Sequence, residues 1–67
     1  MNIEMIGTWA GLVWNTLNGV ESMGIKQLRK ETKLKEKEIL TTIGWLGREG
    51  KLNITEVDGE IVLALNK

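Results

Sequence analysis

The chain has 67 residues, a length that predicts one small domain. Its nine basic and nine acidic side chains balance, so it lacks the positive excess of a dedicated nucleic-acid binder. Cysteine and histidine are both absent, which excludes disulfides, thiolate metal sites and acid–base catalysis by histidine. The sequence also lacks a phosphate-binding glycine loop and a carboxylate pair set among apolar residues. We therefore expect a protein that is not an enzyme and that uses no cofactor and no metal.

The same composition predicts a cytoplasmic location, since small secreted domains usually depend on disulfides. The apolar run over residues 5–14 is much shorter than the roughly 20 residues that span a bilayer. Only Glu4 is charged before this run, whereas a signal peptide begins with positive charge. We therefore expect the run to form a core helix, with no membrane as a partner.

A first helix is predicted over residues 3–17, ending at Asn18 with Gly19 in a left-handed conformation. Its core stripe has helical spacing and consists of Ile3, Ile6, Ala10, Val13, Trp14 and Leu17. A second apolar strip beside it widens the apolar surface to roughly 200°, whereas a small core needs about 100°. This surplus predicts a homodimer interface formed by Met5, Trp9 and Leu12 together with Trp45. The open alternative is that these residues simply cover a thin core.

Gly7 and Gly11 lie four residues apart in the first helix, a spacing that lets another helix approach closely. A close helix crossing within the chain explains the pair as well as a contact with a second chain does.

Two further helices are predicted over residues 25–32 and 36–49. Gly24 is the N-cap of the second helix, and Ile25 and Leu28 point inward. The third helix has a core stripe with Leu40 at its edge, and Gly50 stops it. That stripe consists of Ile39, Ile43 and Leu46.

A β-hairpin is predicted over residues 52–57 and 60–65, because Asp58-Gly59 is a strong signal for a two-residue type I′ turn. The turn fixes six pairs, from Val57 with Glu60 to Leu52 with Leu65. One face of this hairpin is then apolar except for Glu56 near the tip. The apolar pattern and the turn chemistry thus predict the same register.

The predicted order resembles a known fold at two segments. Residues 23–34, MGIKQLRKETKL, resemble the start of the winged helix-turn-helix in many bacterial regulators, and residues 44–52, GWLGREGKL, resemble the end of a recognition helix that leads into a wing. The whole chain is similar to a family of short, stand-alone bacterial winged helix-turn-helix proteins of unknown function. The resemblance implies a single α+β domain over residues 1–67, with three helices followed by a β-hairpin wing. Whether a short extra strand lies between the first two helices is left undecided by the sequence.

This fold makes a DNA duplex the first partner to consider, because its third helix usually enters the major groove. Six of the nine basic residues lie between Lys26 and Glu38, against three acidic ones, which leaves a local charge of +3. The predicted nucleic-acid contacts are Lys26, Arg29, Lys30, Lys33, Lys35, Lys37, Thr41, Thr42 and Arg48.

Three features favour an alternative hypothesis. In it, these lysines form a solvated surface, and the domain is a homodimeric protein-interaction module. The wing is acidic at Glu56, Asp58 and Glu60. Glu38 is predicted to lie on the reading face of the third helix. Trp45 is predicted near the middle of that face, where a homodimer would compete with DNA.

Overall fold

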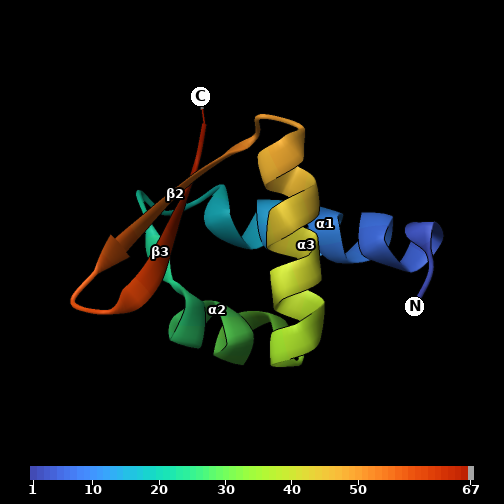
Figure 1. Cartoon of the computed structure of the whole chain (residues 1–67), viewed down its shortest axis with the longest axis horizontal. Coiled ribbons are helices and arrows are strands. Elements are labelled where there is room, and N and C mark those ends of the chain that lie inside the picture. Colours follow the sequence, from blue (N-terminus) through green and yellow to red (C-terminus); the bar gives the residue numbers. More distant parts are fainter. Residues whose placement is uncertain (67) are drawn as a thin grey trace.

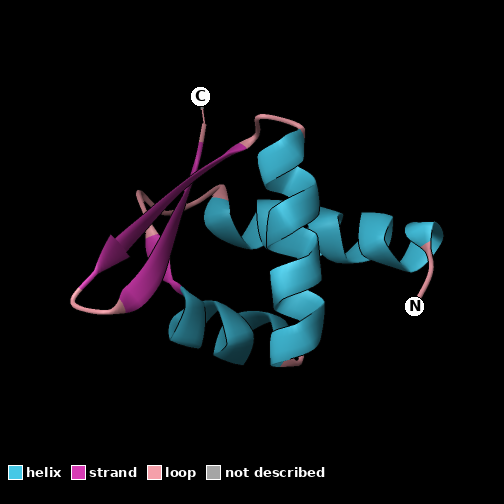
Figure 2. Cartoon of the chain, in the orientation of Figure 1, coloured by secondary structure: helices cyan, strands magenta, loops and turns pink. Residues whose placement is uncertain are grey.

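A computed structural model describes residues 1–66 and contains three helices and a three-stranded sheet (Figures 1 and 2). The elements in chain order are α1 (Ile3–Leu17), β1 (Met23–Gly24), α2 (Ile25–Thr32), α3 (Glu36–Arg48), β2 (Leu52–Val57) and β3 (Glu60–Leu65). They begin and end at the residues that the sequence pattern indicates, except that α3 ends one residue early, with Glu49 as its C-cap. The short extra strand between the first two helices is β1.

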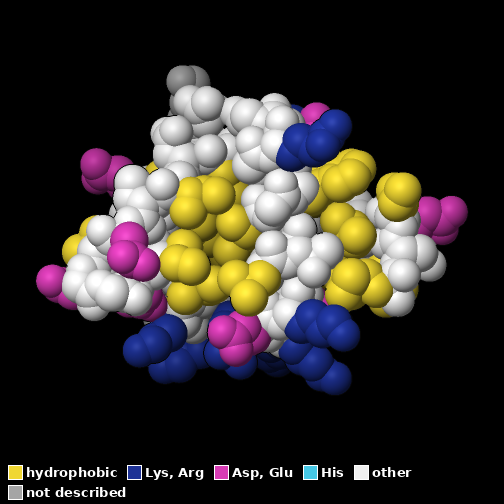
Figure 3. All heavy atoms as spheres, viewed as in Figure 1, with side chains coloured by type: hydrophobic (Ala, Val, Ile, Leu, Met, Phe, Trp, Pro, Cys, Tyr) yellow, Lys and Arg dark blue, Asp and Glu magenta, His cyan; other side chains and the backbone are white. Residues whose placement is uncertain are grey.

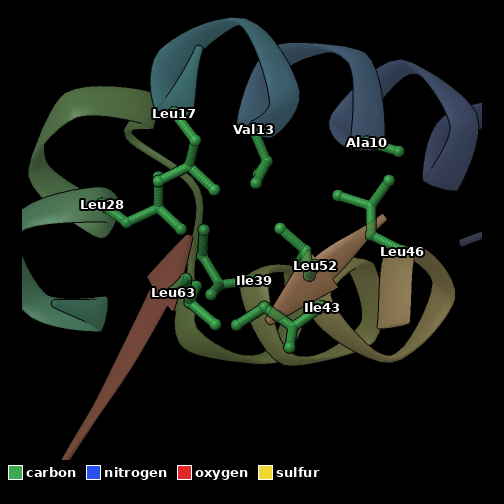
Figure 4. Close-up of a cluster of buried hydrophobic side chains, with 9 residues drawn as sticks. All are labelled: Ala10, Val13, Leu17, Leu28, Ile39, Ile43, Leu46, Leu52 and Leu63. Atoms are coloured by element: carbon green, nitrogen blue, oxygen red, sulfur yellow. The ribbon is translucent and has the colours of Figure 1, made fainter. Parts of the chain in front are cut away.

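The core lies where α3 crosses the second half of α1 and where both meet the sheet (Figures 1 and 4). Each helix and each of the two longer strands contributes to it. The buried apolar side chains are Ala10, Val13, Leu17, Leu28, Ile39, Ile43, Leu46, Leu52 and Leu63. Leu34 of the turn between α2 and α3 packs against them.

The N-terminal half of α1 extends past α3 and is largely outside the core (Figure 1). Ile3 is 69% exposed and Trp14 is 39% exposed, so the prediction that both belong to the core stripe is wrong. Ile3 is exposed because α3 covers α1 only where the two helices cross. Trp14 lies between the buried Val13 and Leu17, at the open edge of the contact between α1 and α3. The apolar stripe of α1 is therefore longer than the surface that covers it.

The hairpin has the predicted register, with Val57 opposite Glu60 and Leu52 opposite Leu65. Asp58 and Gly59 both have positive φ, at 51° and 80°, as a type I′ turn requires. Strand β3 is central, because its other edge pairs antiparallel with β1. Ile54 lies on the inner face but is 48% exposed.

The ends of the helices differ from one another in conformation. Gly50 follows α3 with φ 72° and ends it as predicted, whereas the predicted left-handed Gly19 is wrong, since Gly50 and Gly59 are the glycines with positive φ among residues 1–66. Asn18 closes α1 in the right-handed region, with its N–H bonded to the carbonyl of Trp14. Lys33 closes α2 in the left-handed region, which the sequence did not indicate.

The N-terminus of α2 is capped from the wing. Its N-cap, Gly24, has no side chain to accept a hydrogen bond, and the carboxylate of Glu60 on β3 accepts one from the N–H of Lys26 at 3.2 Å. A Cβ on residue 24 would lie 2.8 Å from that carboxylate oxygen. Gly24 therefore leaves the space in which Glu60 accepts from one of the free N–H groups and compensates the positive end of the helix dipole.

We expect Glu60→Ala to lower the free energy of unfolding by about 1 kcal/mol, as the loss of an N-cap typically does. Urea unfolding followed by circular dichroism measures the change. Glu56→Ala is the matched control, because Glu56 is an exposed carboxylate on the same hairpin, and surface changes of this kind usually stay within about 0.5 kcal/mol. An equal loss in both variants would show that the cap contributes nothing.

Candidate nucleic-acid interface

One side of α2 carries four cationic side chains around a surface hollow. Lys26, Arg29, Lys30 and Lys33 have the spacing of one helical face, and with Leu34 they line a hollow of about 540 Å³. In Figure 3 the Lys and Arg side chains gather along the lower edge, where Figure 1 places α2 and the start of α3. A concave surface with charges of one sign concentrates counter-ions such as phosphate groups. Four of the nine predicted contact residues thus meet in one place.

Lys33 has a backbone conformation that glycine normally adopts. Its φ is 60°, and its N–H donates to the carbonyl of Arg29 at 2.8 Å, which closes the last turn of α2. For a residue with a Cβ this conformation costs about 1–2 kcal/mol. A cation at this end of a helix is favoured by the helix dipole, which offsets part of that cost. The turn thus holds a lysine at the border of the hollow.

The first turn of α3 adds two further cations beside the hollow. Lys35 and Lys37 are exposed, and the backbone N–H of Lys35 donates to the carboxylate of Glu38 at 2.8 Å. The prediction that Glu38 lies on the reading face is therefore corrected. Its half-buried side chain turns back to cap the N-terminus of its own helix.

The outward face of α3 is a stripe of Lys37, Thr41, Gly44 and Arg48 at helical spacing. Nothing lies within 4 Å of a Cβ built on Gly44, so the backbone there is open to close approach. The hydroxyl of Thr41 donates to the carbonyl of Lys37 at 2.8 Å, which leaves its oxygen able to accept a hydrogen bond. The face thus has cations at both ends and small residues between them.

Thr42 does not belong to this face, and its prediction as a contact residue is wrong. Its side chain is fully buried, and its hydroxyl donates to the carbonyl of Glu38 at 2.7 Å. The reason is helical geometry, because Thr42 lies next to the core positions Ile39 and Ile43, whereas Thr41 lies opposite them.

The acidic wing has two different kinds of carboxylate. Glu56 and Asp58 are exposed near the tip, and Glu60 is half-buried against the start of α2. The carboxylate of Glu60 is therefore used in a contact within the fold. The carboxylates of Glu56 and Asp58 are the ones that a molecule bound at the wing tip would meet.

The four residues predicted for a homodimer do not lie together. Met5, Trp9 and Leu12 form one strip of α1, in which Met5 and Leu12 are 42% and 41% exposed. Trp45 instead borders a groove between α1 and α3, on a strip of α1 that is roughly 150° away at 100° per residue. Trp45 therefore lies at the side of α3 and not in the middle of its outward face.

Within residues 1–66 there is no group of three or more acidic side chains close enough together to hold a metal ion. None of the three helices in this range is both long enough and apolar enough to cross a membrane.

Three helices, a helix-turn-helix formed by α2 and α3, and a hairpin packed beside them define a winged helix domain. The chain belongs to the winged helix-turn-helix domain family DUF2582, whose model matches residues 1–65. It is similar to protein BT2368 from Bacteroides thetaiotaomicron, whose solution NMR structure is 31% identical, with a TM-score of 0.85 over 97% of this chain and 79% of that one. No curated protein matches the chain. The predicted fold and family are thus confirmed.

Sequence reasoning missed two features of this surface. Leu34 is not among the predicted contact residues, yet this side chain lines the cationic hollow. The sequence pattern predicts only that Glu60 is an acidic wing residue unfavourable to DNA. In the structure its carboxylate caps the N-terminus of α2. A glycine at the N-cap of α2 was the available signal, because such a helix needs its cap from elsewhere.

We expect Lys33→Gly to separate stability from binding. It should raise the free energy of unfolding by about 0.5–1 kcal/mol by relieving the left-handed backbone, and weaken DNA binding by removing a cation. Thermal unfolding and a fluorescence-anisotropy titration measure the two effects. Lys33→Ala is the control, since it removes the same charge but keeps the strain. A gain in stability for both variants would contradict the role given to the backbone.

Proposed function

We propose that the protein binds duplex DNA without catalysis, in the manner of a transcription regulator, with α3 in the major groove. The observation that carries the proposal is that the cationic hollow of α2 adjoins the first turn of α3. In a winged helix that juxtaposition suits a phosphate backbone beside the groove that α3 reads.

The dimensions of α3 support this placement. Lys37 and Arg48 are eleven residues apart, which at 1.5 Å per residue separates them by roughly 16 Å along the axis. The major groove is about 12 Å wide, so the two cations suit phosphates on its opposite sides. Thr41 and the open backbone at Gly44 then lie toward the base edges.

The balance of charge supports weak and salt-dependent affinity. The chain is neutral overall, and Glu56 and Asp58 at the wing tip repel phosphate. Binding then depends on the lysines and arginine of α2 and of the turn before α3, whose contacts carry no sequence information. Thr41 is the remaining candidate for base contacts, so discrimination between sequences is modest.

The same proposal places the protein in the cytoplasm and without an enzymatic role. The sequence contains no cysteine, histidine or tyrosine, which removes the side chains most used for nucleophilic and proton-transfer chemistry at neutral pH.

A protein-interaction module is the second candidate, and a specific surface favours it. Leu40 and Ile54 are 45% and 48% exposed, beside the outward face of α3 and on the inner face of the wing. Figure 3 shows apolar side chains gathered between α3 and the hairpin. An exposed apolar surface of this kind is typical of protein contacts and unfavourable opposite phosphates.

We expect the triple variant Lys33→Ala/Lys35→Ala/Lys37→Ala to weaken binding to every duplex tested, because it removes cations that neutralise phosphates. The plot of log affinity against log salt should become less steep by about 2 to 3, near 0.9 for each phosphate that is no longer neutralised. Fluorescence anisotropy at several salt concentrations measures both quantities. Glu21→Ala, which changes an exposed charge outside α2 and α3, is the control and should leave the slope unchanged.

An amide-shift NMR titration with a mixed-sequence duplex at low salt locates the surface independently. Shifts concentrated between Lys26 and Arg48 that fade as salt rises are expected. The absence of shifts at low salt would reject DNA binding and favour the protein-interaction module.

A further inference from the structure

The apolar stripe of α1 continues past its own core. Ala10, Val13 and Leu17 are buried on this stripe, whereas Ile3, one helical turn before Ile6, is 69% exposed. Figure 3 shows apolar side chains gathered to the right of α3, over this projecting half of α1. A short helix in water is stable mainly through packing of its apolar face, so the projecting half calls for a partner.

A groove begins at the end of this projecting half and runs along residues 7–15 of α1. It has a volume of about 340 Å³ and lies between α1 and the C-terminal part of α3, with Trp14 and Trp45 among its walls and Lys51 at its border. Gly7 and Gly11 also line it, and nothing lies within 4 Å of a Cβ built on either glycine. Tryptophan is the residue most enriched at the centres of interfaces, and both indoles are partly exposed here.

We propose that a second copy of this chain occupies the groove, with the two α1 helices packed antiparallel about a two-fold axis between Gly7 and Gly11. This homodimer does not depend on DNA binding. In a two-fold contact the same surface serves both partners, so each position must fit its symmetric counterpart.

The order of residues along α1 suits such a two-fold contact. Pairing residue 7 with residue 11 places Ile3 and Glu4 of one copy near Trp14 of its partner. Small residues then lie at the crossing, where the helices are closest, and large ones lie at the ends, where the helices diverge. The partly exposed indole of Trp14 and the exposed side chain of Ile3 cover each other.

Charge favours a second copy over an unrelated partner. Glu4 is the only charged residue of α1, and Lys51 is the only charged residue among residues 1–66 that lines the groove. The antiparallel arrangement brings Glu4 of each copy to the end of the groove that Trp14 and Lys51 border in the other. The two opposite charges therefore meet twice in the dimer.

Sedimentation equilibrium of the full chain, from micromolar to millimolar protein, is the first test, and we expect a monomer–dimer equilibrium. Gly7→Leu should weaken the dimer about tenfold or more, because its side chain fills the space at the crossing. Gly44→Leu is the matched control, since Gly44 is equally open but lies on the outward face of α3. Circular dichroism of each variant checks that the domain remains folded.

A charge exchange tests the antiparallel pairing itself. Glu4→Lys and Lys51→Glu should each weaken the dimer, and the double variant should restore it, because the opposite charges meet again. Leu12→Glu, on the other strip of α1, should leave the dimer unchanged.

Three outcomes would overturn the proposal: a wild-type protein that stays monomeric at millimolar concentration, a dimer that tolerates Gly7→Leu, or a double charge variant no tighter than its weaker parent. Dissociation by Leu12→Glu alone would move the interface to Met5, Trp9 and Leu12. Each of these results leaves the DNA-binding test unaffected, since that test concerns α2 and the outward face of α3.

Discussion

A core of nine apolar side chains among residues 1–66 has to hold three helices and a sheet together. Because this core can cover only a small area of each element, it determines which side chains remain at the surface. The crossing of α3 over α1 uses Ala10 and Leu46, and the residues of α1 before that crossing are exposed except for the half-buried Ile6 and Trp9. In α2 only Leu28 and Thr32 are buried, so this helix depends on its contact with the core through Leu28 and the half-buried Ile25, and on the cap from β3. A domain of this size buries little surface, and each such contact counts.

The same limit separates the charged surface from the apolar one. Because α2 uses one face for Leu28, its remaining faces carry Lys26, Arg29, Lys30 and Lys33 around the hollow. The groove beside Trp45 lies toward the other end of α3, so a dimer formed there leaves the cationic surface exposed. Together the two proposals are consistent with a neutral chain, since two linked copies double the phosphate contacts that one copy makes weakly.

Local signals in the sequence predicted most of the fold. Asp58-Gly59 determined the hairpin register, and helical spacing with Gly24 and Gly50 located the helices, because each of these signals acts within a few residues. The errors concern contacts between distant elements. Trp14 has core spacing but lies at the open edge of the contact between α1 and α3, and the cap by Glu60 depends on β1 pairing with β3. Thr42 is a different case, since the stripe of Ile39 and Ile43 already implied its burial.

The cap by Glu60 also constrains how an anion can bind. A free helix N-terminus attracts phosphate through its backbone N–H groups, but at α2 the carboxylate already accepts from the N–H of Lys26. The carboxylate therefore disfavours a phosphate at this helix end, and the hollow offers a phosphate mainly the side chains that line it. Such contacts come from long, flexible lysines and one arginine, and they are strongly screened by salt. This makes the salt dependence of binding the property that follows most directly from the architecture of α2 and the wing.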